Sequence, residues 1–137
     1  MKKRINPKRI IFVSVISISI LVLTLLVCSF FVIYKDVKAV CLRAQNEYKE
    51  DCVDSLIKYI QSDNNTFRAR NSAIWALGQL ADKKALLFLY ELDKSIPEQN
   101  RCNYDKYLCK YEIQKAIKWC EKGNITSWMY RNKESWR

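Results

Sequence analysis

The sequence predicts an all-α protein with a single N-terminal transmembrane helix, followed by a short α-solenoid that disulfides brace. Residues 10–34 carry no charge, proline or glycine, and apolar residues after Tyr34 recur at helical spacing. The 137 residues include only 2 glycines and 2 prolines, too few for the turns of a many-stranded β fold. We expect four parts: 1–9, a basic cytoplasmic tail; 10–34, a transmembrane signal anchor; 35–123, a helical-repeat domain; and 124–137, an aromatic and basic C-terminal tail.

The apolar segment 10–34 is long enough to cross a bilayer. A helix rises about 1.5 Å per residue, so roughly 20 residues span the hydrocarbon. Residues 1–9 hold five Lys or Arg and no acid, whereas basic residues after Tyr34 are more thinly spread. The positive-inside rule therefore predicts a single-pass protein of the cell membrane, with a cytoplasmic N-terminus and an extracytoplasmic C-terminal domain.

The apolar segment has two other interpretations, a cleaved signal peptide and a lipoprotein signal. Val37–Ala39 resembles the small-residue pattern that precedes a signal-peptide cleavage point, but a signal peptide's apolar region is typically about 7–15 residues long. A lipoprotein signal at Cys28 would need a small residue where Val27 stands. We therefore favour an uncleaved anchor.

The cysteines agree with an exported domain. The chain has 6 cysteines, of which Cys28 lies in the apolar segment. The density of the others predicts disulfides in an oxidising compartment, with one thiol left over. Cys41 with Cys52 is the first candidate pair, and Cys102 is expected to pair with either Cys109 or Cys120. The full candidate set is Cys41, Cys52, Cys102, Cys109 and Cys120.

The pattern after Tyr34 predicts about five helices with short connections. Residues 62–66 form a turn that supplies an N-cap, residues 95–100 form a loop, and Gly123 ends the last helix. The expected helices cover residues 36–48, 53–60, 67–80, 85–92 and 104–122.

The order of these elements repeats. Val53–Ile57 corresponds to Leu86–Tyr90, 33 residues later, and Ala69–Leu80 corresponds to Cys109–Cys120, 40 residues later. Two-helix units at this spacing are typical of an α-solenoid.

Residues 69–85, ARNSAIWALGQLADKKA, carry a resemblance to a known family. They are similar to a HEAT repeat of the phycobilisome-lyase-like type, whose pattern is roughly V-R-x-x-A-a-x-A-L-G-x-[IL]-x-D-x-x-A. The neighbouring repeat departs from it, with Lys110 in place of the arginine and Lys118 in place of the glycine. The resemblance covers about residues 51–122. The matching residues are Arg70, Ala73, Ala76, Leu77, Gly78, Asp82 and Ala85.

This resemblance implies structural roles for the matching residues. Small residues let the helices of such repeats stack closely, while the arginine and aspartate, here Arg70 and Asp82, bridge neighbouring units. The family includes bilin lyases, but most members are interaction scaffolds.

The composition argues against common catalytic sites. The chain has no histidine, so it forms no Ser-His or Cys-His pair and no Cys₂His₂ zinc site by itself. It also lacks glycine-rich phosphate loops and any CxxC pair. The acids around Asp51 and Asp54 are ordinary complements of a helix N-terminus. We predict no catalytic residue, no cofactor and no metal site.

The expected function is a membrane-anchored, non-catalytic interaction module or scaffold. Its partner is expected to be another membrane or envelope protein, or a second copy of this chain. An accessory enzyme of the lyase type is the alternative. A basic nucleic-acid-binding solenoid is the less favoured alternative, because the domain is expected to face away from the cytoplasm and half of the net charge of +10 belongs to the cytoplasmic tail. The aromatic C-terminal third either caps the solenoid or contacts the partner, with Tyr104, Tyr107, Tyr111, Trp128, Tyr130 and Trp136 as interface candidates.

Overall fold

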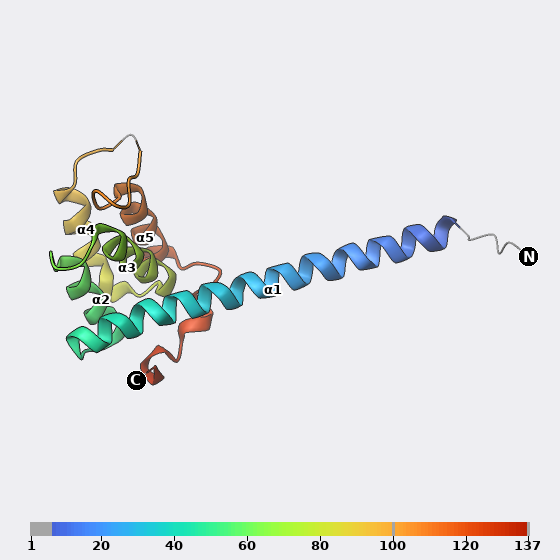
Figure 1. The fold of residues 1–137 in the computed structure, drawn as a ribbon, viewed down its shortest axis with the longest axis horizontal. Coiled ribbons are helices and arrows are strands. Elements are labelled where there is room, and N and C mark those ends of the chain that lie inside the picture. The colour runs from blue at the N-terminus through green and yellow to red at the C-terminus, as the bar shows by residue number, and fades with distance from the viewer. Residues whose placement is uncertain (1–6, 100, 137) are drawn as a thin grey trace, which may run out of the picture. The chain divides into compact units, whose positions relative to one another are not determined.

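The computed structural model describes residues 7–99 and 101–136, and every regular element in these ranges is helical (Figure 1). The all-α class is confirmed. Most of the predicted basic tail, residues 1–6, and the final residue of the predicted C-terminal tail lie outside the described residues. The elements are α1 (Pro7–Tyr48), α2 (Cys52–Gln61), α3 (Phe67–Leu80), η1 (Lys83–Ala85), α4 (Leu86–Ser95), α5 (Lys110–Lys122), η2 (Ser127–Tyr130) and η3 (Lys133–Ser135).

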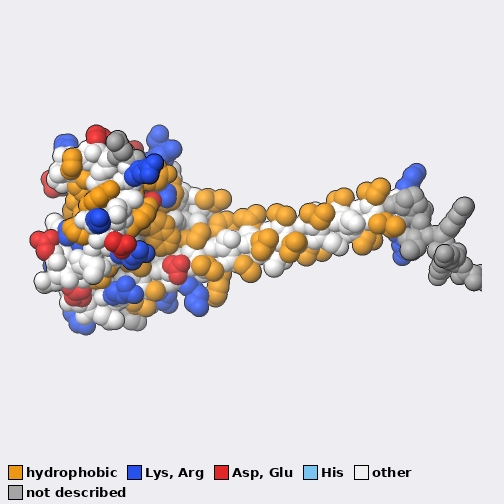
Figure 2. All heavy atoms as spheres, turned by 45° about the horizontal axis from the view of Figure 1, so that its top comes forward, with side chains coloured by type: hydrophobic (Ala, Val, Ile, Leu, Met, Phe, Trp, Pro, Cys, Tyr) orange, Lys and Arg blue, Asp and Glu red, His pale blue; other side chains and the backbone are white. Residues whose placement is uncertain are grey.

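The chain divides into two units, with the boundary between Ile33 and Tyr34. The first unit is the N-terminal part of α1, whose apolar side chains are exposed along its length (Figure 2). The hydroxyls of Ser19, Thr24 and Ser29 donate to carbonyls one turn earlier at 2.8–2.9 Å, so they need no water. By length and composition, α1 can cross a membrane.

The second unit begins with the C-terminal part of α1. The helix predicted at residues 36–48 belongs to α1, because no proline or glycine interrupts the chain after Tyr34. Val37, Cys41 and Ala44 are fully buried, as their helical spacing predicts. α1 ends where Lys49 takes a left-handed conformation (φ 59°).

Polar residues cap and join α2 and α3. Asp51 accepts a hydrogen bond from the Asp54 N–H at 3.0 Å, and Thr66 accepts one from the Ala69 N–H at 3.3 Å, which are N-cap interactions. The Arg70 guanidinium donates to the Ile60 carbonyl at 2.6 Å and pairs with Asp63 at 3.0 Å. Arg70 therefore ties the end of α2 to the start of α3.

Helices α3 and α5 approach each other closely at Gly78. A Cβ at this position would lie 2.9 Å from the Ala116 Cα and 3.0 Å from the Trp119 ring. Ala73, Ala76 and Leu77 of α3 are fully buried. α3 packs on both α2 and α5, and α4 packs on α5 (Figure 1).

The last long helix is shorter than predicted. α5 begins at Lys110 rather than near Tyr104, because Asn103–Tyr107 forms a separate turn in which the Asn103 carbonyl accepts from the Lys106 and Tyr107 N–H groups. Tyr104, Tyr107 and Tyr111 therefore do not share one helix face.

The C-terminal segment, residues 124–136, packs onto the second unit. The Asn124 amide donates to the carbonyls of Gly78 and Gln79 at 2.9 and 3.1 Å, where α3 ends. Tyr130 stacks on Tyr34 with ring centroids 6.1 Å apart, and Trp136 meets both rings edge-on. The Trp136 indole also donates to the Tyr34 hydroxyl at 3.2 Å.

Two cysteine pairs lie at disulfide distance. The Cα atoms of Cys41 and Cys52 are 5.4 Å apart, and those of Cys102 and Cys109 are 5.3 Å apart. Of the two partners left open for Cys102, the structure places Cys109 beside it. Cys120 is buried and unpaired, with its thiol directed at the Leu77 carbonyl, and burial raises its pKa to about 11.

We expect Gly78→Val to destabilise the second unit by about 1–3 kcal/mol, because the added methyls meet the backbone of α5. Thermal unfolding followed by circular dichroism measures this change. Ser72→Val is the matched control, since Ser72 lies on the same helix and is not buried. Equal melting midpoints for the two variants would contradict the close approach of α3 and α5.

We expect protein purified from membranes without reductant to carry both cysteine pairs as disulfides. In a Cys28→Ser background, maleimide should label no thiol in the folded protein, because Cys120 is buried and largely un-ionised. Denaturation should expose Cys120 alone, and denaturation with reductant should expose all the remaining cysteines. Labelling of all of them in unreduced, denatured protein would exclude the pairing.

Candidate functional site

An apolar groove lies beside the N-terminus of α3. It has a volume of 660 Å³ and is lined mainly by apolar and aromatic side chains. Phe67, the first residue of α3, keeps 38% of its surface exposed there. The lining residues, which define this groove, are Phe67, Ile96, Pro97, Gln99, Arg101, Tyr107 and Leu108.

Hydrogen bonds hold the two sides of the apolar groove in place. The Gln99 side chain donates to the Leu108 carbonyl at 2.9 Å and accepts from the Lys110 N–H at 3.1 Å. Gln99 thereby caps α5, whose preceding residue Cys109 makes no side-chain cap. The Tyr107 hydroxyl donates to the Arg101 carbonyl at 2.6 Å.

Asn71 of α3 holds the segment that contains Tyr107 and Leu108 in place. Its side chain, only 3% exposed, accepts from the Cys109 N–H at 2.8 Å and donates to the carbonyls of Tyr107 and Tyr104 at 2.8 and 3.3 Å. A buried amide that satisfies three backbone groups holds this turn against α3. The apolar groove is therefore built on supported backbone.

Charged side chains border this wall of the domain. Arg68 pairs with Asp105 through two hydrogen bonds of 2.7 and 2.8 Å, and Lys110 pairs with Glu98 at 3.0 Å. An apolar centre with a polar border is the usual anatomy of a protein-binding surface.

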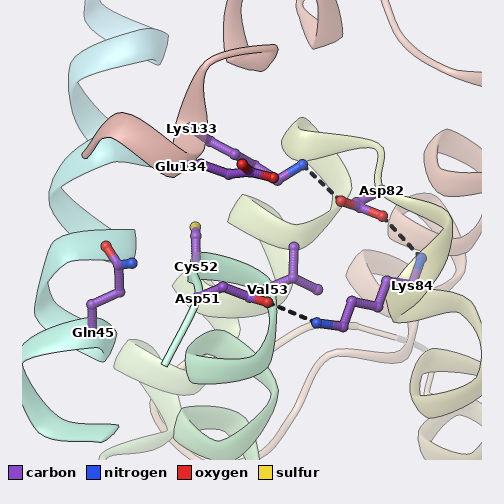
Figure 3. A pocket seen from close by; sticks show the side chains of 8 residues that line it. All are labelled: Gln45, Asp51, Cys52, Val53, Asp82, Lys84, Lys133 and Glu134. Atoms are coloured by element: carbon purple, nitrogen blue, oxygen red, sulfur yellow. Dashed lines mark hydrogen bonds and ion pairs between the residues drawn. The ribbon is translucent and has the colours of Figure 1, made fainter. Parts of the chain in front are cut away.

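A second pocket, of 540 Å³, is lined mainly by charged and polar side chains (Figure 3). Lys84 lies 2.7 Å from Asp51 and 2.5 Å from Asp54, and Lys133 lies 2.7 Å from Asp82. The pocket thus joins the start of α2, the turn after α3 and the C-terminal segment. Its lining residues are Gln45, Asp51, Cys52, Val53, Asp82, Lys84, Lys133 and Glu134.

Hydrogen bonds and ion pairs in this charged pocket favour the ionised forms of two of its carboxylates, Asp82 and Asp51. Partial burial alone would raise the pKa of Asp82, but hydrogen bonds from Lys133 and from the Lys84 N–H outweigh it, so the pKa is lowered. The pKa of Asp51 is lowered in the same way, since the Asp54 N–H and Lys84 outweigh partial burial. Carboxylates held in their charged form by adjacent lysines are suited to structure rather than to proton transfer.

The residues of the predicted repeat lie in the core, at a helix contact or at helix ends. Ala73, Ala76, Leu77 and Ala85 are fully buried. Gly78 lies at the helix contact, as described above, and Arg70 joins α2 to α3. Asp82 caps η1 by accepting from the Lys84 N–H at 3.0 Å.

The aromatic interface candidates divide into two sets. Tyr130 and Trp136 are 2% and 5% exposed, so they pack within the domain, where both contact Tyr34. Tyr104, Tyr111 and Trp128 are exposed, and Tyr107 lines the apolar groove.

Several residues that build the groove were not found from the sequence. The sequence predicted Phe67 only as the start of a helix. No motif marks Asn71 or Gln99 as residues that hydrogen-bond the backbone of another segment. The one available signal was the polar Asn71 within the inward-facing stretch of α3.

The chain was compared with known families, characterised proteins and solved structures, and none of them matches it.

We expect Asp82→Asn to lower the stability of the domain by about 1 kcal/mol or less at pH 7, through loss of the pair with Lys133. The folded-state pKa of Asp82 lies below its ordinary value of 3.8, so its contribution is present above that pH and is lost as the pH falls through the folded pKa. Melting curves should therefore differ at pH 7 and converge in strong acid. Glu91→Gln, at an exposed site on α4, is the control. A difference in melting temperature between Asp82→Asn and the unchanged chain that grows in acid would contradict the stabilising role of the Asp82–Lys133 pair.

Proposed function

We propose that this chain is a membrane-anchored interaction module of the HEAT-repeat type, with a non-catalytic extracytoplasmic domain that binds another membrane or envelope protein. The apolar groove carries the proposal, because it exposes Phe67 and Tyr107 on a wall that Asn71 and Gln99 hold in place. Aromatic side chains and arginine dominate the binding energy of many interfaces, and an ordered site loses less entropy on binding.

The anchor supports the same function. Residues 10–34 form a helix of sufficient length and apolarity, and the basic residues of 1–9 favour a cytoplasmic N-terminus. A tether keeps the groove close to other proteins of the membrane, which raises its effective concentration for them.

The disulfide-distance pairs support export and rigidity. The pair Cys102 and Cys109 encloses Tyr107 and Leu108, both of which line the groove. In an oxidising compartment such a bridge would constrain the unfolded chain and so favour the folded groove by about 2–3 kcal/mol.

The HEAT assignment rests on the packing around α3. Close stacking at Gly78 and Ala116 agrees with the small residues that the resemblance leads us to expect, while Arg70 ties α2 to α3 within one predicted unit. A small array leaves unpartnered faces at its ends, which suits a binding module.

Photocrosslinking in intact membranes tests the function. A photoreactive amino acid in place of Phe67 should give a discrete adduct with a membrane or envelope protein, or with a second copy of this chain. The same substitution at Leu87, an apolar residue of α4 that is 73% exposed and lies outside the groove, is the matched control.

The adduct at position 67 should disappear when Tyr107→Ala removes part of the groove wall. Adducts of the same kind at both positions, or an adduct that Tyr107→Ala leaves unchanged, would contradict the proposed site.

A further inference from the structure

The C-terminal segment leaves two large apolar side chains in solvent beside a buried aromatic cluster. Ile125 is 73% exposed and Trp128 is 60% exposed, whereas Tyr130, two residues further on, is 2% exposed. Neither Ile125 nor Trp128 lines the apolar groove or the charged pocket. Their exposure therefore has no explanation in the packing of the domain.

The aromatic cluster fixes where this segment lies relative to Tyr34. Tyr130 stacks on Tyr34 at 6.1 Å with the ring planes 4° apart, and Trp136 donates to the Tyr34 hydroxyl at 3.2 Å. Asn124 holds the beginning of the segment on the end of α3. Both ends of the segment are thus attached, and η2 lies close to Tyr34.

Tyr34 is the last residue of the uncharged run, and Lys35 and Asp36 follow it. If residues 10–34 cross the bilayer, Tyr34 lies where the hydrocarbon ends and the headgroup region begins. That region is about 5–7 Å deep on each side of the hydrocarbon. Trp128 is two residues from Tyr130, so their Cα atoms are within about 7 Å of each other.

We infer that Trp128 enters the interfacial region of the outer lipid leaflet, so that the C-terminal segment is a second membrane contact of this domain. Tryptophan prefers this region because its ring is apolar while its N–H remains hydrogen-bonded to water or headgroups. The inference rests on the membrane anchor of the proposed function.

The experiment uses the full chain in phosphatidylcholine and phosphatidylglycerol vesicles whose acyl chains are brominated near the headgroup. Bromine quenches tryptophan on contact, and fluorescence is compared with that in unbrominated vesicles. Trp128→Phe should remove most of the bromine-dependent quenching, because Trp136, which also contacts Tyr34, is only 5% exposed. Trp75→Phe, at a partly exposed tryptophan of α3 that lies near Tyr104, should leave it unchanged.

Flotation of the vesicles separates the two ways in which the idea could fail. If the protein floats with the lipid but Trp128→Phe is quenched as strongly as the unchanged chain, the proposed lipid contact is wrong. The membrane anchor then still stands. Protein that does not float overturns the anchor and the lipid contact together. Circular dichroism of each variant shows that the helical fold is kept.

Discussion

The close approach of α3 to α5 at Gly78 and Ala116 is the contact on which the rest of the domain depends. Because Gly78 has no Cβ, the backbones of α3 and α5 approach each other closely at this point. α3 also packs on α2, so it contacts both helices. The carbonyl of Gly78 also accepts a hydrogen bond from Asn124. One residue without a side chain thus serves both the helix contact and the attachment of the C-terminal segment.

Side-chain amides hydrogen-bond the backbone of the irregular segments, which in many folds is satisfied within short turns. Asn71 and Asn124 satisfy backbone groups 36 and 45 residues away in the sequence, and Gln99 satisfies those of Leu108 and Lys110 across the loop. A chain with so few glycines and prolines has little turn chemistry, so its irregular segments need these distant partners. The walls of the apolar groove and the path of the C-terminal segment follow from these bonds.

The two cavities of the domain differ in what they offer a ligand. In the charged pocket, Asp51 and Asp82 already have lysine partners, so a charged ligand would have to break existing ion pairs. In the apolar groove, Phe67 keeps 38% of its surface exposed and Tyr107 lines the wall. Burial of such surface is favourable for any partner of matching shape, and this difference places the proposed binding site at the groove.

The sequence by itself determined the helical class, the apolar segment and most helix boundaries, because these depend on local patterns. The spacing of Val37, Cys41 and Ala44 was enough to identify a buried stripe, and Thr66 was enough to mark the start of α3. Tertiary structure decided where α5 begins, since the turn before it depends on Asn71, a residue far away along the chain. It also decided that Tyr130 and Trp136 are buried while Trp128 is exposed. Aromatic side chains are common both in cores and at interfaces, so the sequence alone does not tell which of them are buried. Tyr130 and Trp136 are buried because they pack on Tyr34 in the folded chain.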